Sequence, residues 1–93
     1  MNADYRRFPQ YDAWGEYVQS GNRGYIYITI AGQCGFKFTM NGVLVRIDEL
    51  SAGTWETFTK KADREWWVEH NRTVYRTVLS CLNMFLSGTG RSR

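Results

Sequence analysis

The side chains able to do acid–base or nucleophilic chemistry are few in this chain and lie far apart in sequence. His70 is the single histidine and follows Glu69 in a segment with helical periodicity. Neighbouring helical positions point about 100° apart, so these two residues cannot act together as a base and its orienting group. Cys34 lies in a Gly-Gln-Cys-Gly stretch and has no positive neighbour in sequence that would favour its thiolate. The sequence therefore indicates no catalytic centre.

Metal and cofactor sites are not predicted either. Cys34 and Cys81 form no CxxC motif and no cluster with histidine, so zinc ligation is not expected. Asp48, Glu49 and Glu56 could approach one another as an acidic cluster, but solvated carboxylates at strand ends are the commoner outcome. We therefore predict a protein that is not an enzyme, with no catalytic residues, no metal and no cofactor.

Aromatic and basic residues alternate in a way that suits nucleic-acid binding. Tyr25 and Tyr27 are two positions apart on a predicted strand, and Lys37 and Arg46 lie on the neighbouring predicted strands. Bases could stack on the two rings while the cations contact phosphates, as in proteins that bind single-stranded nucleic acid on the surface of a β-sheet. Two further lysines, Lys60 and Lys61, could extend this basic surface. The competing interpretation is that the N-terminal segment covers the same face.

Tryptophan and arginine residues support a second hypothesis, which is binding to another protein. These residue types dominate the hot spots of protein interfaces. Trp66 and Trp67 are adjacent on a predicted helix and cannot both face one core, so Trp66 is a candidate anchor. The other candidates are Trp14, Arg23 and Arg76. Alternatively, Trp66 covers the end of the sheet.

The composition fits a folded binding protein of small size. The chain has 93 residues, of which 43% are hydrophobic and 16% aromatic, which excludes a disordered chain. So many rings exceed what one small core can hold, so we expect some of them at the surface. The net charge of +3 permits nucleic-acid binding without requiring it. With no signal-peptide pattern and no apolar run of membrane-spanning length, we expect a cytoplasmic protein without membrane contact.

The elements that must position these residues begin with a sheet. Alternating apolar residues predict strands over 24–31, 35–41 and 43–49. Asn41-Gly42 between the last two predicts a two-residue type I′ turn flanked by Met40 and Val43. That register places Phe38 opposite Val45 and Phe36 opposite Ile47.

Strand periodicity gives this sheet one apolar face and one aromatic-basic face. The apolar face carries Ile26, Ile28, Ile30, Phe36, Phe38, Val45 and Ile47. The other face carries Tyr25, Tyr27, Thr29, Lys37, Thr39, Leu44 and Arg46.

Helical spacing occurs on both sides of the predicted sheet. Residues 10–19, after Pro9, carry aromatic residues three positions apart and predict a short helix. Residues 62–86 predict a long C-terminal helix with an apolar stripe. Between sheet and helix, residues 54–59 fit a strand by composition and the start of the helix by spacing, and we favour the strand.

Together these elements predict an α+β fold in the order α-β-β-β-(β)-α. An antiparallel sheet of three or four strands packs against the long C-terminal helix, and a short helix precedes it. The whole chain, 1–93, is expected to form a single domain, with a lead-in over 1–8 and a tail over 88–93 that are less ordered. The order is similar to that of the double-stranded-RNA-binding domain, as are the lysines of Lys60-Lys61-Ala62 before the last helix. The His-containing loop of that family is missing, and we do not assign the chain to it.

The sequence thus favours a non-enzymatic binding module that acts through protein–protein contacts. A compact chain without catalytic motifs suits a small stoichiometric inhibitor or adaptor of the kind that phages and mobile elements encode, by analogy alone. The alternative is a nucleic-acid-binding protein that uses the face of Tyr25, Tyr27, Lys37 and Arg46. Either a monomer or a homodimer is compatible with the sequence.

Overall fold

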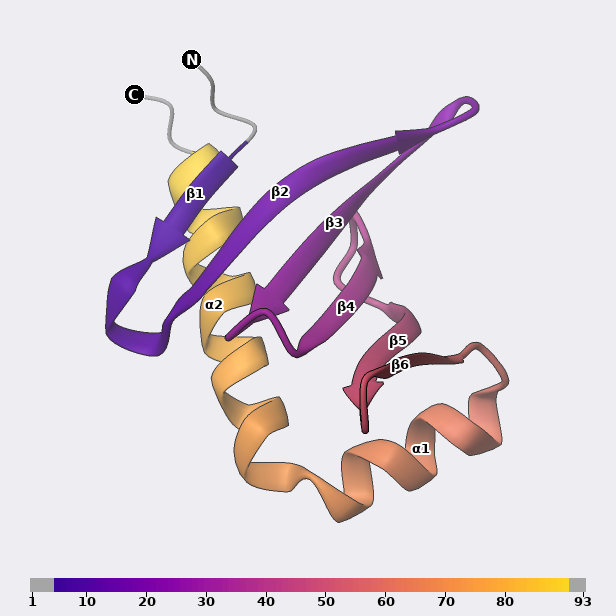
Figure 1. Ribbon diagram of the computed structural model, residues 1–93. Helices are drawn as coiled ribbons and strands as arrows, with labels where there is room; N and C mark the ends of the chain where they lie inside the picture. Colours follow the sequence, from indigo (N-terminus) through magenta and orange to yellow (C-terminus); the bar gives the residue numbers. More distant parts are fainter. Residues whose placement is uncertain (1–4, 91–93) are drawn as a thin grey trace.

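The computed structural model describes residues 5–90 and consists of one antiparallel sheet with two helices that follow it in sequence (Figure 1). Six strands pair in sequence order, so that every strand lies next to its neighbours in the chain. The strands are β1 (Tyr5–Phe8), β2 (Ala13–Ser20), β3 (Arg23–Ile30), β4 (Cys34–Thr39), β5 (Leu44–Ser51) and β6 (Thr54–Phe58). The helices are α1 (Lys61–His70) and α2 (Arg72–Gly90).

The predicted N-terminal helix over 10–19 is wrong, and so is the three- or four-stranded sheet. A single 3-10 turn (Pro9–Tyr11) is followed by β2, which pairs with β3 over all eight of its residues. The three-residue spacing of aromatic residues there does not mark a helical stripe, because Trp14 and Tyr17 fall on opposite faces of the strand. Gly15 explains why α2 can approach β2 so closely: a Cβ at this position would lie 2.9 Å from Phe85.

Both helices lie on one face of the sheet, and the core fills the space between the two layers (Figure 1). Fully buried residues come from alternate positions of β3, β4 and β5, as the strand periodicity predicted, with Val45 the exception treated below. The helices contribute Trp67, Val78, Cys81, Leu82 and Phe85. Trp67 packs edge-on against Phe36, with ring centroids 5.3 Å apart.

The hairpin between β4 and β5 has a longer loop than the predicted type I′ turn. The amide of Gly42 donates to the Thr39 carbonyl (2.9 Å) and that of Thr39 to the Val43 carbonyl (2.8 Å). Only Gly42 has a positive φ, of 85°, which fits a three-residue loop closed by a glycine. The longer loop and a register irregularity at Lys37/Phe38 place Leu44, and not Val45, opposite Phe38. Leu44 therefore packs against the core instead of lying on the aromatic-basic face.

The long predicted helix is interrupted at Asn71. This residue leaves the helical region with φ −138° and ψ 45°, and its side-chain amide donates to the Trp67 carbonyl at 2.8 Å. The Asn71 carbonyl then accepts the first backbone hydrogen bond of α2, from Tyr75. Asn71 thus ends α1 and begins α2, and the break lets each helix follow a different part of the sheet.

The described ends of the chain extend the two layers. Tyr5–Phe8 pairs with β2, and α2 continues to Gly90. Parts of the predicted lead-in and tail, residues 1–4 and 91–93, lie outside the described residues.

Thr54–Phe58 is a strand, as its composition predicted. With six strands and no leading helix, the element order no longer resembles the double-stranded-RNA-binding domain.

Neither helix among the described residues has the length and apolar character needed to span a membrane.

Candidate functional site

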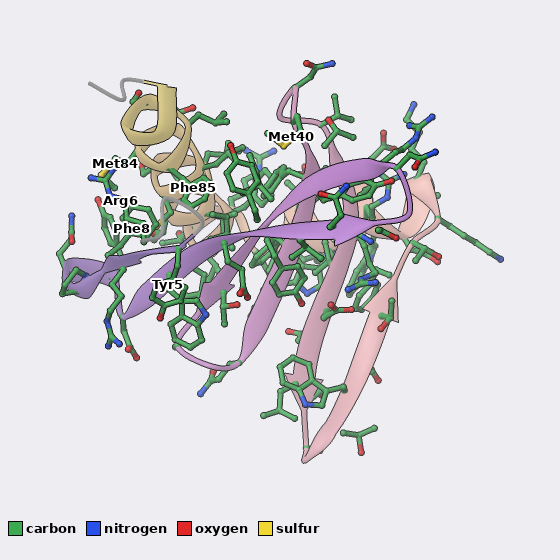
Figure 2. The ribbon with its side chains drawn as sticks, turned by 90° about the horizontal axis from the view of Figure 1, so that it is seen from above. Tyr5, Arg6, Phe8, Met40, Met84 and Phe85 are labelled. Atoms are coloured by element: carbon green, nitrogen blue, oxygen red, sulfur yellow. The ribbon has the colours of Figure 1, made fainter. Side chains whose placement is uncertain are left out.

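The face of the sheet opposite the helices has no second layer over it in the described part of the chain. We call it the open face. Figure 2 shows how β1 separates the two sides: Arg6 and Phe8 point toward α2 near Met84 and Phe85, whereas Tyr5 points the opposite way. The register of the sheet places the following side chains on the open face: Tyr5, Arg7, Trp14, Glu16, Val18, Ser20, Arg23, Tyr25, Tyr27, Thr29, Lys37, Thr39, Arg46, Asp48, Leu50, Trp55 and Thr57.

The centre of the open face is a hydrogen-bonded network around Asp48. Tyr27 on β3 reaches across β4 and donates its hydroxyl to Asp48 Oδ2 at 2.5 Å. The hydroxyl of Thr57 on β6 donates to the other carboxylate oxygen at 2.9 Å, and Arg46 pairs with Asp48 at 3.3 Å. Side chains of three strands, β3, β5 and β6, are therefore linked on this face, and β4 contributes only the space beneath the Tyr27 ring.

That space exists because Gly35 on β4 has no side chain. A Cβ at this position would overlap the Tyr27 hydroxyl group. Burial and the hydrogen bond to Asp48 both raise the pKa of Tyr27 well above its usual value, and Arg46 opposes the shift only in part. The phenol is therefore a fixed, neutral hydrogen-bond donor at ordinary pH.

The basic residues of the open face lie against its tyrosine rings. Lys37 Nζ is 4.4 Å from the ring centroid of Tyr25, and the Arg46 guanidinium is 5.9 Å from that of Tyr27. Such cation–π contacts hold the side chains in place without neutralising the charge. The structure thus brings together Tyr25, Tyr27, Lys37 and Arg46, the four residues that the sequence placed on one face, and β1 and β2 extend this face instead of covering it.

The exposed apolar residues of the open face lie toward the β5–β6 hairpin. Leu50 and Trp55 are directly opposite each other and are 36% and 53% exposed. Tyr5, at the other end of the sheet, is also exposed. Sequence reasoning did not single out Leu50, Trp55 or Tyr5 as site residues. Residues 5–8 were not predicted to form a strand, and residues 54–59 were predicted as a strand without a pairing register.

The four residues proposed as protein anchors come from separate parts of the molecule. Trp66 on α1 is 56% exposed and stacks on His70 with ring centroids 4.4 Å apart. Arg76 is exposed on α2, and Arg23 is exposed at the start of β3. Trp14 is half-buried on the open face. Trp14 and Trp66 therefore belong to different faces and cannot serve one flat interface.

The lysines proposed to extend the basic surface lie at the beginning of α1. Lys60 precedes the first turn, and Lys61 forms an ion pair with Glu65 at 3.7 Å. Both are in the segment that leads from β6 to the helical layer, so they do not continue the row of Lys37 and Arg46.

The groups able to do chemistry remain apart from one another. The His70 ring nitrogen Nδ1 donates to the Trp66 carbonyl at 2.8 Å, so this histidine is held by its own helix. Cys34 is half-buried, and burial together with the Glu49 carboxylate raises its pKa; burial also raises the pKa of Cys81. Both shifts disfavour the nucleophilic thiolate. No three histidine, cysteine or acidic side chains within the described residues are grouped as metal ligands would be.

A hollow of about 360 Å³ lies on the helical side, between α1, α2 and the start of β5. Leu44, Val68 and Tyr75 form its apolar lining, and Arg64 lies beside them. Arg64 already donates to the carbonyl oxygens of Thr59 and Leu44, each at 2.9 Å. Its guanidinium therefore serves mainly to attach α1 to the sheet.

Comparison of the chain with family models, with curated proteins and with solved structures finds no match in any of the three. The geometry of the open face is therefore the ground on which a function is proposed.

Proposed function

We propose that this protein is a non-enzymatic binding module that recognises another protein through its open face, as a small stoichiometric inhibitor or adaptor would. The observation that carries the proposal is the uncovered sheet surface with the Tyr27–Asp48–Arg46 network at its centre and exposed aromatic residues around it. Tyrosine, tryptophan and arginine are the side chains that contribute most to protein interfaces. Side chains held in place before binding lose little conformational entropy when a partner arrives.

Charge favours a protein over a nucleic acid as the partner. Asp48 lies at the centre of the open face, and its pairing with Arg46 removes one cation from phosphate binding. Glu16 adds a second carboxylate on β2, beside Tyr27. Carboxylates among the rings would repel a phosphate backbone, whereas a protein surface can offer hydrogen-bond donors to them.

The test is capture of a partner from a lysate of the native host by the tagged full chain, with and without nuclease. We expect a defined protein band that survives nuclease and is lost with Trp55→Ala. Trp55 is 53% exposed, so its removal should leave the fold intact. Leu79→Ala on α2 is the matched control, because Leu79 is an exposed apolar residue of the helical layer. Once the partner is purified, Trp55→Ala should weaken its binding by roughly 30-fold, as for a hot-spot residue worth about 2 kcal/mol.

Two results would contradict this proposal. If capture survives Trp55→Ala and Trp14→Ala but is lost with Trp66→Ala, the partner binds the helical layer and not the open face. If nuclease removes every captured protein, a nucleic acid mediates the binding.

Nucleic-acid binding is the second candidate function, and unpaired cations on the open face favour it. Arg7, Arg23 and Lys37 form no ion pair with any described residue. Binding of labelled single-stranded oligonucleotides should then fall steeply as salt rises. It should weaken with Lys37→Ala and Tyr27→Ala, and not with Arg76→Ala on α2. Affinity that does not change between low and high salt would exclude this function.

A further inference from the structure

Strand β6 is an edge of the sheet, and no other strand of residues 5–90 pairs with its outer side. Residues 54–57 are all exposed, and only Phe58 at the end of the strand is half-buried. The strand contains no proline and no lysine, the residues with which natural proteins commonly block an edge. The opposite edge, β1, differs in that it carries Arg6 and Arg7, and Arg6 donates to the Met84 carbonyl of α2 at 2.8 Å.

The turn before β6 determines which backbone groups face outward. Ala52 and Gly53 both have positive φ, of 52° and 81°, as in a two-residue type I′ turn. Ser51 and Thr54 close this turn as a hydrogen-bonded pair, and such pairs alternate along an antiparallel ladder. Thr54, Glu56 and Phe58 therefore bond to β5, and the amide and carbonyl groups of Trp55 and Thr57 point away from the sheet.

A pair of carboxylates lies across this edge on the helical side of the sheet. Glu49 on β5 is directly opposite Glu56 on β6. Neither residue forms an ion pair within the described part of the chain. Like charges directly opposite each other destabilise a sheet. A positive side chain beside Glu56 would relieve this repulsion.

We propose that β6 pairs with an extended segment of the protein partner, whose side chains alternate between basic and apolar. The basic residue lies opposite Glu56 on the helical side, and its apolar neighbours lie on the open face beside Trp55 and Thr57. Backbone hydrogen bonds to Trp55 and Thr57 supply affinity, and the alternating side chains supply specificity. This inference rests on the proposed function, because it names the segment by which a protein partner would reach the open face.

Charge also argues against a second copy of this chain as the occupant of the edge. In the antiparallel register that uses both outward-facing residues of each β6 strand, Trp55 of one copy bonds to Thr57 of the other. That register, which forms the most backbone hydrogen bonds, places the two copies of Glu56 directly opposite each other, and a further carboxylate would join the pair already present.

The probe is a short acetylated and amidated peptide that alternates valine and lysine, titrated into the ¹⁵N-labelled full chain. We expect the largest amide shifts at Trp55 and Thr57, with hydrogen exchange of these two amides slowed by about tenfold or more at saturation. A peptide that alternates valine and glutamate should bind about tenfold more weakly because of Glu49 and Glu56. Glu56→Lys should reverse that order of preference.

Two variants of one residue separate backbone pairing from side-chain effects. Thr57→Pro removes an outward-facing amide and should abolish binding of the lysine peptide, since proline is tolerated on the outer side of an edge strand. Thr57→Val loses the hydroxyl that donates to Asp48 but keeps the amide, so it should retain much more of the lysine-peptide affinity than Thr57→Pro does. If Thr57→Pro does not fold, the reversal of preference by Glu56→Lys still decides the matter.

Several results would overturn the inference. These are the absence of amide shifts on β6 at millimolar peptide, equal binding of the two peptides, or a dimer in sedimentation that Thr57→Pro dissociates.

Failure of the edge pairing can be distinguished from failure of the proposed function. A captured partner that Trp55→Ala releases but Thr57→Pro retains refutes the edge pairing alone. Peptide binding at β6 with no nuclease-resistant partner refutes the proposed function alone.

Discussion

Tyr27 and Gly35 depend on each other, because the ring of one lies in the space that the other leaves empty. Tyr27 crosses β4 above Gly35 and ends at Asp48 on β5. The arrangement resembles the covering of a strand glycine by a neighbouring aromatic residue, which pins strand register. The Tyr27–Asp48 hydrogen bond on the open face therefore depends on Gly35 having no side chain.

Gly35→Ala should destabilise the protein by about 1–3 kcal/mol, the usual cost of forcing extra atoms into a packed site. The new methyl group would displace the Tyr27 hydroxyl from Asp48. The control is Gly24→Ala on β3, where the nearest atom to a new Cβ is 3.8 Å away. Urea unfolding of the two variants provides the comparison, and an equal effect of both would contradict the role given to Gly35.

Stability should decrease at alkaline pH partly because of Tyr27. Burial and Asp48 raise the pKa of this phenol in the folded state above its usual value of about 10. Below pH 10 the Tyr27 phenol stays protonated in both the folded and the unfolded protein, so its full contribution to the free energy of unfolding is present. Above pH 10 the unfolded state loses the proton first, so the free energy of unfolding falls as pH rises.

Tyr27→Phe should therefore make the loss of stability above pH 10 less steep. Urea unfolding at several pH values between about 9 and 11 measures this slope in both proteins. Burial also raises the pKa of Tyr75, so some dependence should persist in the variant. Identical slopes in the two proteins would show that Tyr27 ionises equally in the folded and unfolded states.

At the scale of elements, Asn71 sets where one helix ends and the next begins. Asn71→Ala would leave the Trp67 carbonyl without its side-chain donor, which should cost about 1 kcal/mol. The control is Asn83→Ala, because Asn83 is exposed on α2 and its side chain forms no hydrogen bond with the described residues. Thermal unfolding followed by circular dichroism compares them. A smaller loss for Asn71→Ala than for Asn83→Ala would contradict the role of Asn71 at the joint.

The central strands and the apolar helical stripe were predictable because each has a single clear periodicity. Ile26 and Ile28 alternate with tyrosines, and Val78, Cys81 and Phe85 recur at helical spacing, so one face of each element is determined locally. The same alternation correctly brought Tyr25 and Tyr27 together with Lys37 and Arg46.

The remaining elements were not predictable because their register depends on distant contacts. In β2 the spacing of Trp14 and Tyr17 fits a helix, and Gly15 lowers strand propensity although it is needed for the approach of Phe85. The β4–β5 loop differs from the predicted turn by one residue, and that residue decides whether Leu44 or Val45 meets the core. The part of the open face near Trp55 lay beyond prediction for the same reason.

At the scale of the whole molecule, β1 joins the beginning of the described chain to its end. Arg6 donates to the carbonyl of Met84, 78 positions away in sequence, and Phe8 is buried in the core. Since β1 is an edge strand of four residues, these contacts and its pairing with β2 hold it in place.

Arg6→Ala should lower stability by about 1 kcal/mol, as expected for an exposed hydrogen bond from a charged donor. It should also speed hydrogen exchange of the β1 amides more than that of β4 amides. Arg7→Ala is the control, because Arg7 is the neighbouring arginine on the open face and its side chain forms no hydrogen bond or ion pair with any described residue. Equal effects of the two variants would refute the link between β1 and α2.

The placement of both helices after the sheet also affects the order in which the protein can be completed during translation. Each strand pairs with the one made just before it, so the sheet can form progressively as the chain leaves the ribosome. Its apolar face, which includes Ile28, Phe36 and Phe38, stays uncovered until α1 and α2 (Lys61–His70 and Arg72–Gly90) have emerged. Until then the nascent chain exposes the apolar face of the sheet to water, and at this stage it is most prone to aggregation and most in need of chaperones.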